Sequence, residues 1–278
     1  MAIPPDILRI ASMLDDEDEN VGVNLLAQLM ERADELGDLP AVLQESRDPV
    51  VRRRAHQLQS ALTMRRRRQS LCARLRSDKP DLLAGLEELH LLWYDRDSAA
   101  EIHSLVREFV SDFRAAAPET PEELDFFLRR CSFLPEPEST LVPESYCIGT
   151  VLERRAGATS LLLAMAVELA PKAGWKLVRT LDEFALTDGR GQLLLGNGAW
   201  RLVAVPANLH GEVWTAAAAL RYFAQTLLSC AVNTDSYRYV MSIAQAVSGD
   251  DSEHVFDCFP YPFRATVPED ETENRGEK

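Results

Sequence analysis

The sequence predicts an α+β protein that is mostly α-helical, and three observations carry this prediction. Apolar residues recur at three-to-four spacing through most of residues 1–134. After Gly174 the apolar spacing changes to every second residue, and beyond residue 212 it returns to the helical pattern. A period near 3.6 puts apolar side chains on one face of a helix, and a period of two does so for a strand. We therefore expect a long helical region, a small sheet and a closing pair of helices.

The composition places the chain among ordinary globular proteins. Its 278 residues are 46% hydrophobic and 27% charged, and the formal net charge is −14. Such an acidic balance favours solubility and argues against general affinity for nucleic acid or for anionic membranes. The first residues, MAIPPDILRI, lack the basic start of a signal peptide, and no apolar run reaches the roughly 18 residues that a membrane span needs. These features predict a cytoplasmic protein with no membrane contact.

The cysteine pattern indicates free thiols in a reducing compartment. The five cysteines are odd in number and scattered, no pair has CxxC spacing, and no histidine lies at ligand spacing from them. A structural zinc site is therefore not expected, and no metal or cofactor is predicted. The cysteines are Cys72, Cys131, Cys147, Cys230 and Cys258.

The N-terminal region contains an internal repeat with an offset of 29 residues. Leu14 aligns with Leu43 and Val21 with Val50, and in each copy an apolar helix end leads into an acidic turn. Asp48 and Pro49 suit a helix start, and the sequence DPVVRRRA at residues 48–55 resembles the second helix of a HEAT repeat. Repeats of this kind stack on a neighbour. We predict HEAT-like repeats in residues 1–62 that cap further helices in residues 63–134.

An arginine-rich stretch interrupts the acidic chain. One interpretation is a solvated helix face whose arginines pair with acids such as Glu45, Asp48 and Asp78. The other is a docking surface for an acidic partner or for RNA, although no aromatic side chains for base stacking lie among the arginines. The candidate surface residues are Arg52, Arg53, Arg54, Arg65, Arg66, Arg67 and Arg68.

Residues 82–133 continue the helical pattern, with breaks at Pro118 and Pro121. Thr120, followed by Pro-Glu-Glu, is a typical start for the last of these helices. Asp95 and Asp97 resemble a metal-ligand pair, but no third carboxylate and no calcium-loop glycine accompany them. A turn is predicted there.

Residues 145–157, with the sequence SYCIGTVLERRAG, follow a proline-rich connector at residues 135–143 and precede an apolar helix at residues 160–170 that Gly174 terminates. This segment resembles the motif that opens the core of SirB-type transglutaminase-like proteins. The resemblance implies a transglutaminase-like core at residues 135–211, in which a central helix packs on a small antiparallel sheet. It also implies HEAT-like helices before the core and a TPR-like helix pair after it.

The charged residues of the motif are expected to be structural. Glu153, Arg154 and Arg155 immediately precede the central helix, where they can brace neighbouring loops through charged hydrogen bonds. Gly157 permits a tight entry into that helix. No substrate contact is predicted for these four residues.

The region after Gly174 reads as three strands. Residues 184–187, 192–195 and 200–205 alternate in the manner of strands, with turns at residues 188–191 and at Asn197-Gly198. Residues 212–265 then carry the two closing helices. The acidic, polar tail at residues 266–278 is predicted to be disordered.

An active transglutaminase-like core needs a cysteine at the start of its central helix, where the helix dipole favours the thiolate, and a histidine base on the strands that follow. The resemblance places the nucleophile at Thr159, and residues 184–205 contain no histidine. The core is therefore expected to be degenerate and non-catalytic. Thr159 and Ser160 are expected to cap the helix with their hydroxyl groups.

Two catalytic alternatives stay open. Cys147 and His210 could form a relocated dyad, or the hydroxyl of Thr159 or Ser160 could act as the nucleophile. Cys147 lies too far from the start of the central helix for the helix dipole to stabilise its thiolate. The hydroxyls of Thr159 and Ser160 have no nearby base.

The leading functional prediction is a non-catalytic scaffold that binds a protein or peptide. The second is a cysteine-type peptidase, amidase or acyl transferase on the same fold. The third is a module that binds RNA or an acidic partner through the arginine-rich stretch.

Overall fold

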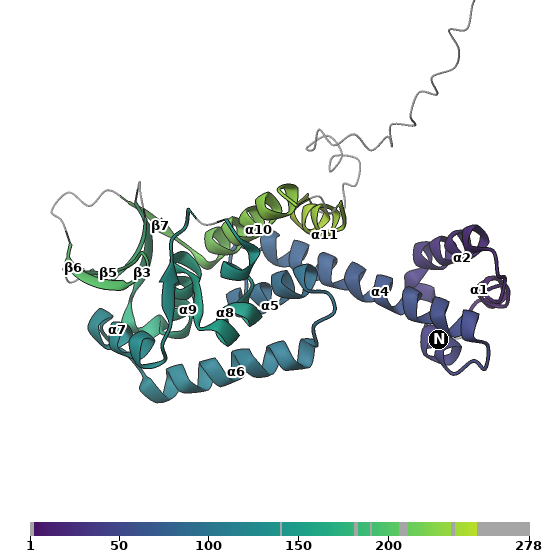
Figure 1. Ribbon diagram of the computed structural model, residues 1–278, viewed down its shortest axis with the longest axis horizontal. Coiled ribbons are helices and arrows are strands. Elements are labelled where there is room, and N and C mark those ends of the chain that lie inside the picture. The colour runs from purple at the N-terminus through teal and green to yellow at the C-terminus, as the bar shows by residue number, and fades with distance from the viewer. Residues whose placement is uncertain are drawn as a thin grey trace, which may run out of the picture.

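The computed structural model describes residues 3–139, 141–180, 183–189, 191–205, 211–234 and 237–248. The described chain is mostly helical, with a small antiparallel sheet, as the sequence predicts. Helix α4 (Pro49–Arg76) runs along the middle of an elongated molecule, with a small helical lobe at one end and the sheet toward the other (Figure 1).

Ten further helices accompany α4 in the described ranges. They are α1 (Pro5–Ala11), α2 (Glu19–Glu31), α3 (Leu39–Gln44), α5 (Leu82–Trp93), α6 (Ala99–Ala116), α7 (Pro121–Arg130), α8 (Ile148–Arg154), α9 (Thr159–Leu169), α10 (Ala216–Val232) and α11 (Tyr237–Ser248). Short 3₁₀ helices lie at Ala33–Glu35, Pro143–Ser145 and Pro171–Ala173.

The N-terminal lobe, formed by α1, α2, α3 and the first half of α4, is two helix pairs around a core of its own. The side chains of Asp18 and Asp48 accept hydrogen bonds from backbone N–H groups at the starts of α2 and α4. The HEAT-like character of these pairs stays a prediction. The buried apolar side chains of the lobe include Ile7, Leu14, Leu25, Leu29, Leu36, Leu39, Leu58 and Leu62.

Helix α4 connects this lobe to the rest of the molecule without a break. It is 28 residues long and runs straight through the predicted division at residue 62. Neither proline nor glycine occurs between Val50 and Arg76, so nothing in the sequence interrupts the helix. Its apolar residues up to Leu62 belong to the lobe, whereas those from Leu71 onward belong to the main core.

Helices α5, α6 and α7 follow α4, as the apolar spacing predicts. The side chains of Asp81 and Ser98 cap α5 and α6. Thr120 and Glu123 form a reciprocal capping box at the start of α7. Together with α8 and α9 these helices enclose the larger apolar core.

The sheet has five antiparallel strands in the order β6-β5-β4-β3-β7, with α9 packed against β3 and β4. Three strands agree with the prediction, β3 and β7 are additional, and β7 lies beyond the predicted core boundary at residue 211. Gly189 and Gly198 have φ angles of 71° in the turns, a region that glycine favours. The strands are β3 (Lys176–Arg179), β4 (Phe184–Thr187), β5 (Gln192–Gly196), β6 (Trp200–Ala204) and β7 (Glu212–Trp214).

A separate parallel pair joins the proline-rich connector to the motif. Strand β1 (Leu134–Glu136) pairs with β2 (Ala156–Ala158), and β2 leads directly into α9. Helix α9 ends at Leu169, and Gly174 adopts a left-handed conformation after a further 3₁₀ turn. The helix therefore begins and ends one residue earlier than the predicted range 160–170.

Helices α10 and α11 close the described chain, and both α4 and α5 pack against them. Their TPR-like character stays a prediction. The predicted disordered tail at residues 266–278 lies outside the described residues. In the part of the chain that the structure covers, no helix is long and apolar enough to span a bilayer.

Candidate functional site

The start of α9 is the position at which the family resemblance expects catalytic chemistry. Thr159 is the first helical residue, and its side chain is buried, with 1% of the residue exposed. Its hydroxyl donates to the carbonyl oxygen of Gly196 at 2.7 Å, and the carbonyl of Glu136 lies 3.3 Å away. A Cβ on Gly196 would lie 2.7 Å from the Thr159 hydroxyl, so this close approach requires glycine.

The prediction that Thr159 or Ser160 caps α9 is wrong. Ala158 occupies the cap position, and no side chain of the cap residue bonds to the helix. Helical geometry begins one residue earlier than expected, so the Thr159 hydroxyl reaches across to β5 instead of the first helical turn. The Ser160 hydroxyl is buried and has no hydrogen-bond partner.

A carboxylate from the proline-rich connector covers the helix start instead. The backbone N–H of Ser160 donates to Glu138 Oε1 at 2.7 Å. The first N–H groups of a helix lack intrahelical partners and carry the positive end of the helix dipole, which favours a negative charge. Glu138 therefore acts as the capping group of α9.

Two tyrosines hold the same carboxylate. The hydroxyls of Tyr146 and Tyr222 donate to Glu138 Oε2 at 3.0 and 3.1 Å. Burial is the main cause that raises the pKa of both phenols, that of Tyr222 to about 12, and the negative charge of Glu138 adds to the shift. Both hydroxyls therefore stay protonated and donate. Glu138, Tyr146, Tyr222 and the Ser160 N–H form what we call the Glu138 network.

Sequence reasoning missed Glu138 because it lies 22 residues before Ser160. It also lies in a connector whose prolines indicate a loop and whose acidic residues have no distinctive spacing. No local pattern links it to α9, and only the pairing of β1 with β2 brings it there.

Cys147 is enclosed in the core. None of its surface is exposed, and burial raises the pKa of its thiol well above the ordinary value. A buried, protonated thiol is not a nucleophile. His210, its predicted partner, lies outside the described residues.

A buried histidine that the sequence analysis did not single out lies on α5. His90 is 1% exposed, and its Nε2 lies 2.9 Å from Asp97 Oδ2. Burial lowers the pKa of the imidazole, and the hydrogen bond to Asp97 opposes that shift. Its Nδ1 has no hydrogen-bond partner. Among the described residues, no hydrogen bond joins a histidine to a cysteine.

Of the three charged motif residues, Arg154 braces the connector through a charged hydrogen bond, as predicted, whereas Arg155 lies over an aromatic ring. Arg154 donates to Glu136 Oε1 at 2.9 Å, and the Arg155 guanidinium lies 5.2 Å from the centre of the Phe133 ring. Glu153 is exposed and takes no part in this brace.

Gly157 has a different role from the predicted one. A Cβ there would lie 2.6 Å from Val151 Cγ1, so glycine lets α8 pack against β2. Its φ angle is not in the left-handed region, and no tight turn depends on it.

Arg54 does not belong to the predicted arginine surface. It is 3% exposed and donates to the carbonyl oxygens of Leu14 at 3.1 Å and Asp18 at 2.9 Å. A Cβ on Gly22 would lie within 2.4 Å of its guanidinium, so this glycine makes room for it. Arg54 is therefore a structural residue of the lobe.

The other arginines that form hydrogen bonds on this stretch also donate to backbone carbonyls. Arg52 reaches Ser46 and Arg47, Arg65 reaches Met30 and Arg67 reaches Leu91. These carbonyls lie at or near the C-terminal ends of α3, α2 and α5, where they lack intrahelical partners. The predicted ion pairs with Glu45, Asp48 and Asp78 do not form. Arg53 and Arg66 are exposed.

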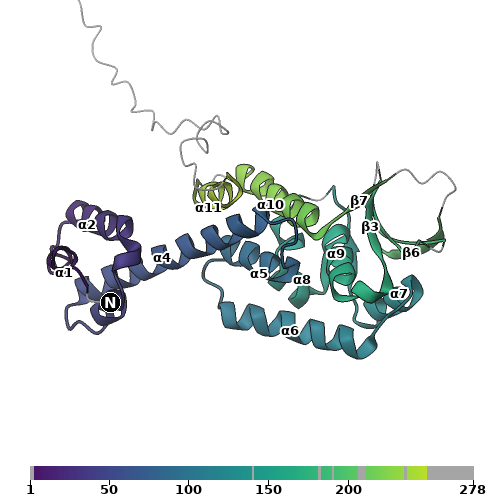
Figure 2. The same ribbon diagram turned by 180° about the vertical axis from the view of Figure 1, so that it is seen from behind.

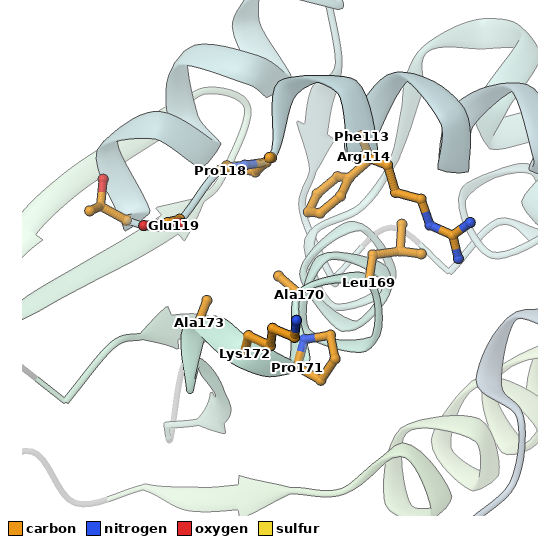
Figure 3. Close-up of a pocket in the computed structure, with 11 residues that line it drawn as sticks. Phe113, Arg114, Pro118, Glu119, Leu169, Ala170, Pro171, Lys172 and Ala173 are labelled. Atoms are coloured by element: carbon orange, nitrogen blue, oxygen red, sulfur yellow. The ribbon is translucent and has the colours of Figure 1, made fainter.

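A pocket of about 600 Å³ lies where the ends of α6 and α9 meet (Figure 3). Phe113 on α6 faces Leu169 and Ala170 at the end of α9, and Arg114 and Lys172 contribute positive charge to the lining. A second pocket of about 580 Å³ lies between α5 and α6 and shares Arg114. We call the first one the α6–α9 pocket.

Comparisons with protein-family models, curated proteins and solved structures find no match. The transglutaminase-like resemblance of residues 145–174 therefore stays a prediction. No group of three or more side chains that could hold a metal ion occurs among the residues that the structure describes.

Proposed function

We propose that this protein is a non-catalytic interaction module that binds a protein or peptide partner. The observation that carries the proposal is the Glu138 network, which covers the start of α9 with a carboxylate of the chain itself. A thiolate or an oxyanion at that helix start would lie beside this negative charge and would be destabilised.

The surroundings of Thr159 support the same conclusion. Its two oxygen neighbours are backbone carbonyls, which accept hydrogen bonds and cannot remove a proton. A hydroxyl nucleophile needs a base within hydrogen-bond distance. The Thr159 hydroxyl therefore acts as a structural link between α9 and β5.

The α6–α9 pocket supports the binding half of the proposal. Leu169 offers a partly exposed apolar surface backed by the buried Phe113, and Arg114 and Lys172 add two cations against the single carboxylate of Glu119. Charge complementarity favours a peptide segment that carries an apolar side chain next to a carboxylate.

The binding experiment selects peptides from a displayed random library against the full chain. We expect selected peptides to combine an apolar side chain with an acid, and to lose affinity for the Arg114→Glu and Lys172→Glu variants. Arg130→Glu and Lys176→Glu reverse exposed charges that do not line the pocket and serve as matched controls. A library that yields no such peptides, or equal losses in the controls, would overturn the pocket as the binding surface.

The catalytic experiment follows hydrolysis of ester, amide and peptide substrates by the native protein. We expect no turnover above the background of the heat-denatured chain. Turnover that disappears in Cys147→Ala or Thr159→Val would overturn the non-catalytic proposal and support the enzyme alternative.

A further inference from the structure

Two arginines lie one helical turn apart on α4, where the helix passes from the lobe core to the main core. Arg65 and Arg68 fall between Leu62, the last buried α4 residue of the lobe core, and Leu71, the first fully buried α4 residue of the main core, and Met64 already packs against the main core. Residues three apart share one helix face. Both arginines are partly buried.

The two arginines differ in their partners. Arg65 donates to the carbonyl oxygen of Met30 at 2.6 Å, at the end of α2. Arg68 forms no hydrogen bond and no ion pair with any residue that the structure describes. Some arginines elsewhere in the chain are paired with acids, such as Arg74 with Glu88 at 3.1 Å and Arg154 with Glu136 at 2.9 Å.

An unpaired, partly buried guanidinium is unfavourable in isolation. Loss of water contacts weakens the charged form, and the positive charge of Arg65 adds repulsion. Both effects lower the pKa of Arg68, burial more than Arg65. The net charge of −14 means that acids are abundant in this chain, yet none of the acids that the structure describes forms an ion pair with Arg65 or Arg68. The pair therefore has the character of an anion-binding site.

Helices α2 and α11 both pack on α4, and both lie on the same side of it in the two opposite views (Figures 1 and 2). Helix α2 lies toward the N-terminal half of α4 and α11 toward the C-terminal half. The hydrogen bond to Met30 places Arg65 beside the C-terminal end of α2.

We propose that Arg65 and Arg68 bind carboxylate side chains of an acidic peptide segment in a protein partner. This inference rests on the proposed binding function and names the chemical class of partner. A guanidinium offers parallel N–H donors that match the two oxygens of a carboxylate, which gives strong and directional hydrogen bonds.

An acidic peptide fits the site better than RNA does. RNA brings one negative charge with every nucleotide, and the acidic surface of this chain repels a polyphosphate over its whole length. RNA recognition also uses large aromatic side chains that stack on bases, and no Phe, Tyr or Trp lies among residues 49–76. Two guanidinium groups match the few charges of a short acidic segment.

The test measures binding of a short, fluorescein-labelled, glutamate-rich peptide to the full chain by fluorescence anisotropy at low salt. Loss of one charge-assisted pair in Arg68→Gln should weaken the affinity roughly tenfold. Arg53→Gln removes the same charge from an exposed position on the same helix and should leave the affinity within about twofold. Arg68→Lys keeps the positive charge but lacks the parallel N–H donors of a guanidinium, so it should give an intermediate affinity.

A thermal melt separates this role from a structural one. A structural Arg68 would make Arg68→Gln melt below the native protein, whereas removal of an unpaired, partly buried cation should leave the melting temperature equal or higher. Added glutamate-rich peptide should raise the melting temperature of the native protein and not that of Arg68→Gln.

Three results would overturn the proposal. They are unchanged affinity in Arg68→Gln, an equal loss in Arg53→Gln, and tighter binding of a single-stranded RNA homopolymer than of the peptide. Peptides selected through the α6–α9 pocket should still bind Arg68→Gln. Failure of the arginine site is therefore distinguishable from failure of the proposed function.

Discussion

At the scale of single residues, polar groups in this protein serve to join segments. Glu138 gathers a backbone N–H and two phenol groups, Thr159 links α9 to β5, and Arg54 links two helices of the lobe. Each of these side chains belongs to a type often used in catalysis or recognition. Burial and the identity of the partner atoms, not the residue type, decide what each one does.

Glu138→Ala should destabilise the fold by roughly 2–4 kcal/mol, because the Ser160 N–H and the hydroxyls of Tyr146 and Tyr222 lose their common acceptor. Urea denaturation followed by circular dichroism measures the change. Glu153→Ala removes an exposed carboxylate of the same chemistry and should shift the midpoint little. A similar midpoint for the two variants would show that the Glu138 network does not hold the connector.

His90 should make stability depend on pH. The folded protein holds the pKa of His90 below the ordinary value of 6.5, so the unfolded chain takes up this proton first as the pH falls. The stabilising contribution of neutral His90 is complete above pH 6.5, the ordinary pKa. It is lost as the pH falls from there towards the pKa of the folded state. The free energy of unfolding should therefore decrease more between about pH 7.5 and about pH 5.5 in the native protein than in His90→Gln. His56→Gln, which replaces an exposed histidine, is the matched control.

At the scale of elements, close backbone packing positions α8 and α9. Gly157 lets Val151 rest on β2, and Gly196 lets Thr159 reach β5. In each case a side chain occupies the space that a Cβ would need. The predicted role of Gly157 as a turn residue came from its position before a helix, whereas the structure assigns it a contact across two elements.

Gly157→Ala should destabilise the protein by roughly 1–3 kcal/mol, because the new methyl group overlaps Val151. Val151→Ala makes space for that methyl group, so the double variant should be less destabilised than the sum of the two single changes by about 1 kcal/mol. Chemical denaturation of the native protein, the two single variants and the double variant completes this double-mutant cycle. Simple additivity would contradict the packing explanation.

At the scale of the whole molecule, two apolar cores share one helix. The lobe core is the smaller, and its buried side chains come only from α1 to α4 and the turns between them. The main core draws on every later helix and on the sheet. Helix α4 is continuous through residues 62–71 and connects the two cores. The buried side chains of the two cores belong to separate clusters.

Leu58→Ala should open a cavity in the lobe core and weaken it by roughly 2–5 kcal/mol. Hydrogen exchange followed by mass spectrometry should then show faster exchange in α1 and α2, with α9 unchanged. Val23→Ala, at a position that is 64% exposed, is the matched control. Equal acceleration in α9 would show that the two cores unfold as one unit.

The correct sequence predictions depend on local chemistry. The capping box at Thr120, the helix start at Asp48 and the alternating strands are each set by neighbours within a few residues. The incorrect ones concern contacts between distant segments. Arg54 bonds to residues 36 and 40 positions away, and no spacing rule distinguishes it from the exposed Arg53 beside it.

The sequence by itself determined the helical and β periods, the acidic balance, and the lack of any cysteine or histidine in residues 159–205. Only the tertiary structure decided that Glu138 covers the start of α9, that Arg54 is buried and that Arg68 has no hydrogen-bond or ion-pair partner among the residues described. The physical reason is the separation along the chain over which each effect acts. Backbone preferences act between near neighbours, whereas the solvation and pairing of a charge depend on whichever distant atoms the fold brings beside it.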